Sequence, residues 1–265
     1  MRRYNTLTIG FALLFMVVPA RAFLDHYLVS ECSVLRPRAS SRLNADSTLQ
    51  NNNDKIRMFE SEGWKNVAED LQRFPLFSIA TPQGNPVAYQ ITVGDEKTFE
   101  IPFFYCDVTE ALAELEKFQT NSEKPTQGEN LKLIPFPLEQ AFKLWCDDKA
   151  VIIPSKASIL QAGASAGTNP IGQRVPMWAC LEISEEQEGG LPPKLPIFMA
   201  LDDANAAVLE AVGGDRKKAD DFEVVCLSLD GAIEQLVNVP EESSFHFIPP
   251  SKSLEYIEEN INEEP

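Results

Sequence analysis

The sequence predicts an α/β (α+β) fold of two tandem pseudo-symmetric units, each a small mixed sheet flanked by helices, preceded by an amphipathic helix. Two observations predict it: short apolar motifs recur in the same order, and β-like runs alternate with helical patterns in both copies. Two copies are too few for a solenoid, so the repeat indicates a duplicated unit. The matched segments, at offsets of 101, 94, 91 and 95 residues, are Phe74–Phe77 with Val175–Trp178, Ile101–Phe104 with Leu195–Phe198, Leu131–Glu139 with Phe222–Asp230, and Ile153–Ser155 with Ile248–Pro250.

The leading amphipathic helix is predicted from Asp54 onward, with Asp54 as its N-cap. Gly63 lies inside the pattern and should weaken the helix by up to ~1 kcal/mol relative to Ala. The apolar residues that share one helical face are Ile56, Phe59, Trp64, Val67 and Leu71.

The first unit is predicted at about residues 74–162, followed by a glycine-containing connector at 163–172. Strands are expected where apolar and β-branched residues cluster between turn signals, and helices where apolar residues recur at helical spacing. The predicted order is strands Leu76–Ala80, Val87–Val93 and Phe99–Cys106, a helix capped by Asp107, a loop Asn121–Asn130, strand Leu131–Phe136, a helix from Leu138, strand Val151–Ile153 and a helix from Ser155.

The second unit, at about residues 175–261, repeats this order. Each unit has too few residues to bury much core alone, so residues 54–265 are expected to fold as one domain. The predicted elements are strands Val175–Ile183 and Leu195–Leu201, helix Asp203–Val212, strand Phe222–Leu227, helix Leu229–Val237, strand Phe245–Ile248 and helix Ser251–Ile261.

The first 22 residues have the pattern of a secretory signal peptide. Two arginines precede an apolar run, Ile9–Val18, that is shorter than the roughly 20 residues needed to cross a bilayer. A small-x-small pattern ends the segment and predicts cleavage there. The residues that mark this site are Ala20, Ala22 and Phe23.

Residues 23–53 are rich in Arg, Ser and Asn and poor in acidic residues, as transit peptides are. A signal peptide followed by Phe23 and such a segment is similar to the two-part presequence of plastids acquired by secondary endosymbiosis. The expected location is therefore a complex plastid, and ordinary secretion with a disordered linker is the alternative.

The chain is strongly acidic, with a formal net charge of −17. Removing residues 1–44, which carry six Arg and two acidic residues, leaves −21. This balance argues against nucleic acid as a partner, because phosphate binding requires clustered Lys and Arg. It fits solubility or attraction to basic partners.

The five cysteines do not predict a disulfide framework, because their number is odd, their spacing is wide and no C-x-x-C pair is present. Three of them, Cys106, Cys180 and Cys226, lie in β-like apolar stretches, where Cys behaves as a small buried hydrophobe.

One motif raises the possibility of catalysis. Gly163–Gly167 matches G-x-S-x-G, and His246 follows Ser165 in the order that α/β-hydrolases use. In those enzymes the motif connects a strand to a helix, whereas here it follows a predicted helix and precedes a loop. A serine hydrolase at Ser165 is therefore the enzymatic alternative, and a flexible connector is the favoured interpretation.

No cofactor or metal is predicted. After processing, His246 is the only histidine, which leaves a histidine-based metal site without ligands. Its alternation with two phenylalanines places it on the outer face of a strand. The acidic pairs Asp147-Asp148, Asp202-Asp203 and Asp220-Asp221 are more typical of helix caps and solvated turns than of a cation site.

The helices of both units carry apolar residues that are expected mainly to face the sheets. Some of them could instead line a groove between helices, and an apolar groove with a charged rim suits an amphipathic helix. The predicted peptide-binding groove consists of Leu115, Phe118, Phe142, Trp145, Val208, Val212, Ile233 and Leu236.

The duplicated x-Pro-apolar-aromatic and x-Pro-x-Phe strands, each followed by an acidic-capped helix, resemble the 22-kDa soluble subunit family of the chloroplast inner-envelope import translocon. The residues that carry the resemblance are Phe74–Phe77, Ile101–Phe104 and Asp107, then Val175–Trp178, Leu195–Phe198 and Asp202. The Asn121–Asn130 loop and the Glu185–Gly190 insertion depart from the compact pattern of the family.

This resemblance implies two related α/β halves without enzymatic activity, located in the envelope intermembrane space, with at most peripheral membrane association. It also implies a chaperone-like role in which plastid precursor proteins and other translocon subunits are the partners. A scaffold that holds neighbouring proteins together, without chaperone activity, is a further alternative.

Overall fold

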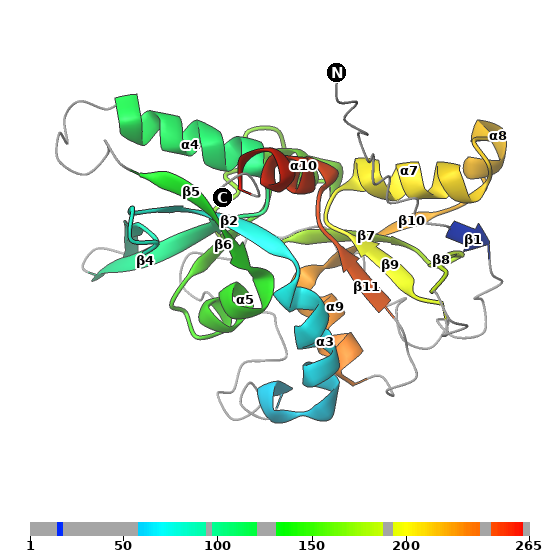
Figure 1. The fold of residues 1–265 in the computed structure, drawn as a ribbon, viewed down its shortest axis with the longest axis horizontal. Helices are drawn as coiled ribbons and strands as arrows, with labels where there is room; N and C mark the ends of the chain where they lie inside the picture. Colours follow the sequence, from blue (N-terminus) through cyan, green and yellow to red (C-terminus); the bar gives the residue numbers. More distant parts are fainter. Residues whose placement is uncertain are drawn as a thin grey trace, which may run out of the picture.

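The computed structural model describes the backbone of residues 15–17, 58–93, 97–120, 131–187, 193–238 and 245–261, and side chains in these ranges except those of 15–17 and 91–99. Two sheets lie side by side between two layers of helices (Figure 1). The predicted fold class is confirmed: both sheets are mixed, both are flanked by helices, and a helix precedes them. The predicted Asn121–Asn130 loop and half of the Glu185–Gly190 insertion lie outside the described residues.

The first unit contains a five-stranded sheet in which β6 and β3 both pair with β4. Strands β4 and β6 pair in parallel, and the pairs β3–β4, β4–β2 and β2–β5 are antiparallel. Its elements are β2 (Pro75–Ala80), β3 (Ala88–Val93), β4 (Lys97–Tyr105), α4 (Val108–Thr120), β5 (Lys132–Pro137), α5 (Leu138–Cys146), β6 (Val151–Ile153) and α6 (Lys156–Gln161).

The second unit contains a four-stranded sheet in the order β10-β7-β9-β11. Two elements were not predicted separately: β8, which follows a turn after β7, and the short helix α8. Its elements are β7 (Pro176–Cys180), β8 (Ile183–Glu185), β9 (Leu195–Phe198), α7 (Leu201–Ala211), α8 (Arg216–Ala219), β10 (Val224–Ser228), α9 (Leu229–Val237), β11 (Phe245–Ile248) and α10 (Ser251–Asn260).

Strand β8 also pairs with β1 (Phe15–Val17), a short strand within the predicted signal peptide. Cleavage after Ala22 would remove β1 and leave β8 without this partner. The presequence boundaries themselves stay predictions.

The strand pairing of the first sheet recurs in the second. The antiparallel pairs β2–β5 and β2–β4 correspond to β7–β10 and β7–β9, and the parallel pair β4–β6 corresponds to β9–β11. Matching connections use matching hydrogen bonds. The Leu138 amide donates to the Phe74 carbonyl as Leu229 donates to Val175, and the Cys106 amide donates to Ile153 as Met199 donates to Ile248.

The strand register corrects one of the predicted offsets. Phe77 faces Tyr105 across the first sheet and Trp178 faces Phe198 across the second, so Tyr105 is the counterpart of Phe198. That offset is 93 residues, whereas the matched x-Pro-x-Phe motifs predicted 94. The motif match was one residue out of register because the second copy has a single aromatic where the first has three in a row.

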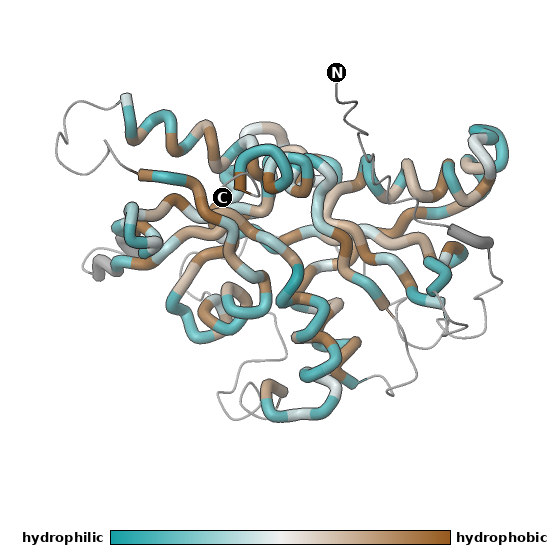
Figure 2. Tube along the Cα trace, viewed as in Figure 1, coloured by the Kyte–Doolittle hydropathy of each residue, from teal (hydrophilic) through white to brown (hydrophobic). Residues whose placement is uncertain are grey.

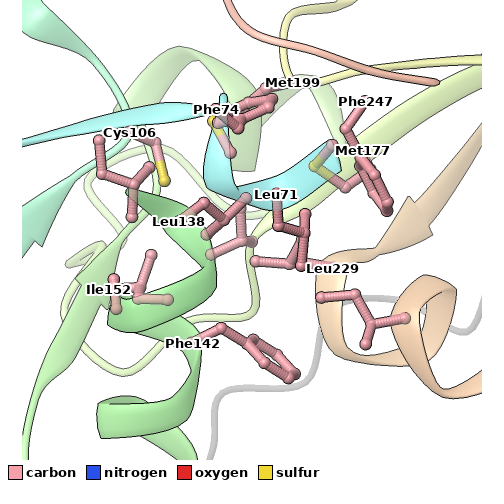
Figure 3. Packing of buried hydrophobic residues seen from close by; sticks show 14 of the residues in the cluster. Leu71, Phe74, Cys106, Leu138, Phe142, Ile152, Met177, Met199, Leu229 and Phe247 are labelled. Atoms are coloured by element: carbon pink, nitrogen blue, oxygen red, sulfur yellow. The ribbon is translucent and has the colours of Figure 1, made fainter. Parts of the chain in front are cut away.

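Alternation along the strands divides the interior into three clusters. On one face of both sheets lies a single continuous core, here called the shared core, which includes Leu76 and Phe104 from the first unit and Met177 and Ile197 from the second. Figure 3 shows side chains of both units converging there. The opposite faces carry a first-unit cluster around Phe77 and Tyr105 and a second-unit cluster around Trp178 and Phe198.

Hydropathy follows this layering. The central strands are largely hydrophobic, while the ends of α4, α7 and α8 are hydrophilic (Figure 2). Helices α4, α7 and α10 cover one side of the sheets, and α3, α5 and α9 cover the side of the shared core (Figure 1).

The last helix of each unit, α6 in the first and α10 in the second, is here called its closing helix, and residues on or next to each one pack against the other unit. Helix α10 belongs to the second unit, yet its Tyr256 and Ile257 pack on the first-unit cluster. In return, Ala162 at the end of α6 packs on the second-unit cluster. The first-unit cluster is therefore partly covered by the second unit, and the second-unit cluster is contacted by the first.

Candidate functional site

The leading helix is α3 (Glu62–Gln72), and it lies between α5 and α9 on the face of the shared core (Figure 1). Its N-cap is Ser61, whose Oγ accepts a hydrogen bond from the Trp64 amide at 3.1 Å, so the helix begins later than predicted. The predicted cap, Asp54, lies outside the described residues. Trp64, Val67 and Leu71 are 3 %, 0 % and 0 % exposed. Burial of each contributes about 1.5–3 kcal/mol to stability.

Aromatic contacts join α3 to α5. The rings of Trp64 and Phe142 stack with centroids 6.0 Å apart, and Phe59 lies edge-on to both. The Lys143 ammonium lies 5.5 Å from the Trp64 ring centroid. Phe142 and Trp145 of the predicted groove thus pack in an interface already occupied by α3.

Contact between α3 and α9 is closer still. A Cβ placed on Gly63 would lie 1.9 Å from the carbonyl oxygen of Val237. Only glycine permits this approach, so Gly63 is a packing requirement rather than merely a weak point of the helix. Ile233 and Leu236, the predicted groove residues of α9, face the shared core beneath α3.

The eight predicted groove residues fall in three separate places. Phe142, Trp145, Ile233 and Leu236 belong to the shared core under α3. On the opposite side of the sheets, Leu115 and Phe118 pack half-buried on the first-unit cluster, Val208 is buried in the second-unit cluster, and Val212 is the half-buried C-cap of α7. The eight side chains do not line one continuous channel.

The surface over α4 and α10 retains exposed apolar groups. Leu112 on α4 and Leu254 on α10 are 37 % and 43 % exposed, and the two helices are in contact. The exposed charged residues of this pair are mostly acidic: Glu116 on α4 and Glu255, Glu258 and Glu259 on α10, against Lys117 and Lys252. We call Leu112, Leu254 and these four glutamates the α4–α10 surface.

A cavity of about 130 Å³ lies where the N-terminal ends of α4, α6, α7 and α10 meet. Its walls come from both units, including Asp107 and Ser158 from the first and Asp202 and Ser251 from the second. As predicted, Asp107 caps α4, accepting from the Glu110 amide at 3.0 Å. No local sequence pattern predicts this junction, because its lining depends on how the two units pack.

Matching carboxylates cap the closing helices at this junction. Glu110 Oε1 accepts from the Lys156 amide of α6 at 2.7 Å, and Asp203 Oδ2 accepts from the Ser251 amide of α10 at 3.0 Å. Since these amides are already bonded to acidic side chains of the chain itself, the helix ends are not free to bind an anion.

His246 lies in a cluster of charges rather than on an open strand face, which corrects the interpretation of its alternation with Phe245 and Phe247. Its Nδ1 is 2.7 Å from Glu185 Oε2, and its Nε2 is 3.9 Å from Asp70 Oδ1 on α3. The other Asp70 oxygen accepts a hydrogen bond from the Phe247 amide of the edge strand β11.

The cluster shifts two pKa values upward. The hydrogen bond to Glu185 raises the pKa of His246 above its usual value, and the charge of Asp70 also raises it. Burial and the charge of Lys194 lower this pKa but do not cancel the increase. Burial raises the pKa of the Asp70 carboxyl, against the hydrogen bond from Phe247 and the charges of His246, Lys194 and Arg73.

Ser165 lies on an exposed turn after α6, and not between a strand and a helix. Among the residues that the structure describes, the one histidine is His246, and it is paired with Glu185 and Asp70. The segment Gly163–Gly167, which matches G-x-S-x-G, therefore has the geometry of a connector. Within the described ranges, no group of three His, Cys, Asp or Glu side chains is placed to hold a metal ion.

In the part of the chain that the structure describes, no helix has the length and apolar character required to span a bilayer. Four cysteines lie among the described residues, and burial raises the pKa of the Cys180 thiol to about 11. The Cys180 thiol is therefore not a reactive thiolate at neutral pH.

Two solved structures share this fold. One is described as Anabaena Tic22 (protein transport); it is 17 % identical, with a TM-score of 0.58 over 74 % of this chain and 96 % of that one. The other is Tic22 from Plasmodium falciparum, 18 % identical, with a TM-score of 0.53 over 73 % and 96 %. No protein-family model and no curated protein sequence matches the chain. The chain has the Tic22 fold, which confirms the predicted resemblance.

Proposed function

We propose that this protein is a soluble, chaperone-like component of a plastid protein-import machinery, which binds precursor proteins in the envelope intermembrane space. The observation that carries the proposal is the fold: it is shared over 96 % of a structure described as a protein-transport Tic22. The predicted signal and transit-like segments, residues 1–22 and 23–53, support the same location. Precursor proteins and translocon subunits are the proposed partners.

Precursors would bind on the α4–α10 surface. Leu112 and Leu254 offer apolar contacts, and the half-buried Leu115 and Phe118 of the predicted groove lie on the same helix as Leu112. The acidic rim suits basic, amphipathic presequences, because opposite charges raise the encounter rate and apolar burial slows dissociation. The groove residues under α3 would become available only if α3 left its place.

The direct test is a titration of the protein with a labelled basic amphipathic presequence at low and high salt. We expect binding that weakens as salt increases, because salt screens exposed charges. A peptide of the same composition with its amphipathic order scrambled serves as the control. Binding that is absent, or equal for both peptides, contradicts the proposal.

A variant pair locates the surface. Leu112→Ser with Leu254→Ser should weaken presequence binding several-fold, since each removes an exposed apolar contact. Ile171→Ser is the matched control, because Ile171 is 43 % exposed but lies on the connector between the units. Equal effects of both changes would show that binding occurs elsewhere.

Chaperone activity is distinguished from a scaffolding role by a second assay. The protein should suppress the aggregation of an unfolded precursor at near-stoichiometric amounts. Failure to do so, with presequence binding intact, would favour the scaffold alternative.

A further inference from the structure

The charge cluster Asp70–His246–Glu185 joins three elements that are far apart in the sequence. Asp70 lies on α3, His246 on β11 and Glu185 on β8. These side chains are 14 %, 35 % and 16 % exposed, so the cluster is shielded from much of the solvent. Charges in such places are screened less by salt than those on the surface.

The cluster controls how α3 meets the sheet. Strand β11 is at the edge of the second sheet, and the amide of Phe247 would otherwise be an unpaired edge group. One carboxylate oxygen of Asp70 accepts a hydrogen bond from this amide, and the other oxygen faces His246. The imidazole is thereby held between the carboxylates of α3 and β8.

We propose that Asp70, His246 and Glu185 form a pH-sensitive latch that fastens α3 to the edge of the second sheet and loosens as the histidine loses its proton. With a protonated imidazole, one positive charge lies between two negative ones. With a neutral imidazole, two carboxylates remain near each other without a cation between them. Lys194, which precedes β9, and Arg73, at the end of α3, are the other charged groups that act on the cluster.

The direction of the pH effect follows from the raised pKa of His246. A histidine whose folded pKa exceeds its unfolded value stabilises the fold fully below about pH 6.5, and this contribution is lost as the pH rises through the folded value. Burial also raises the pKa of Asp70 from 3.8, so on acidification this carboxylate loses its charge at a higher pH than an ordinary aspartate does. The latch is therefore strongest where the imidazole of His246 is protonated and the carboxyl of Asp70 is still ionised.

The consequence falls on α3 more than on the sheets. Trp64, Val67 and Leu71 still hold the helix by apolar burial, so the latch adjusts how often α3 opens and does not release it outright. Opening would expose Phe142 and Ile233, which α3 covers. This inference concerns α3 alone and stands whether or not precursors bind on the α4–α10 surface.

Native-state amide hydrogen exchange of the whole protein tests the latch. The protection factors of α3 amides, corrected for the intrinsic pH dependence of exchange, should fall about three- to tenfold between about pH 6 and about pH 8, since one unit of pKa shift corresponds to a factor of ten. In His246→Gln the same factors should be independent of pH over this range, whatever their absolute level.

Two further variants separate the latch from a purely structural role of these residues. Glu185→Gln should lower the pKa of His246 measured by NMR titration of its imidazole, and should reduce the pH dependence at α3. Glu186→Gln is the matched control. Glu186 is the exposed neighbour of Glu185, and its substitution changes the net charge by the same amount. Two results would overturn the proposal. One is a pH dependence of α3 protection that is the same in the wild type and in His246→Gln. The other is a His246 pKa that is the same in the wild type and in Glu185→Gln.

Discussion

Gly63 shows how one residue sets the distance between two helices. In the sequence it interrupts an amphipathic pattern, and its low helix propensity predicts a local weakness. In the structure its missing side chain allows the backbone of α3 to touch the carbonyl of Val237 on α9. The sequence pattern carries no information on this contact, because the partner is 174 residues away along the chain.

Gly63→Ala should destabilise the protein by about 1–3 kcal/mol, because the added methyl group meets backbone that must move. The gain in helix propensity, up to ~1 kcal/mol, offsets only part of this cost. Denaturant unfolding measures the change. Asn66→Ala, at an exposed position of the same helix, should change stability by less than about 0.5 kcal/mol. Equal or greater stability of Gly63→Ala would contradict the described helix contact.

The closing helices α6 and α10 show how far a repeat can predict an element. Both helices were predicted at nearly their observed positions from the matched segments around Ile153 and Ile248. Their caps differ, however. Helix α6 has Ser155 as its N-cap, whereas Pro250 gives α10 no side-chain cap and leaves the role to Asp203.

This difference predicts unequal effects of equivalent substitutions. Asp203→Ala should cost about 1 kcal/mol of stability, because α10 loses its side-chain cap. Glu110→Ala should cost less, because Ser155 still bonds the Ser158 amide at 2.9 Å in α6. Thermal unfolding of both variants provides the comparison. A larger loss for Glu110→Ala would contradict the assignment of the caps.

Sequence reasoning found the strands and helices of both units because alternation, helical spacing and turn residues are local. It did not find the exchange of α6 and α10, the insertion of α3 between α5 and α9, or the partners of His246. The predicted groove failed to assemble as one channel for the same reason. An apolar helix face looks alike whether it meets a sheet, another helix or a ligand, and only the packing of distant segments distinguishes these cases.

At the scale of the whole molecule, the two units form a single body. The shared core takes residues from both sheets, α10 packs on the first-unit cluster, and Ala162 at the end of α6 packs on the second-unit cluster. The α4–α10 surface is built from helices of both units. The duplication therefore provides a junction that one unit alone lacks.

Separate expression of residues 54–162 and 163–265 tests this dependence. We expect neither fragment to fold alone, because each leaves its half of the shared core exposed and lacks the closing helix of the other. Circular dichroism and NMR dispersion would detect folding. A cooperatively folded fragment would show that the units are independent domains.

Amide hydrogen exchange of the intact protein in increasing denaturant tests the central claim, that both units unfold together. The most protected amides of β2 in the first sheet and of β7 in the second should exchange with the same free energy and merge into one global unfolding transition. Two distinct free energies, with one sheet opening while the other stays protected, would contradict a shared core.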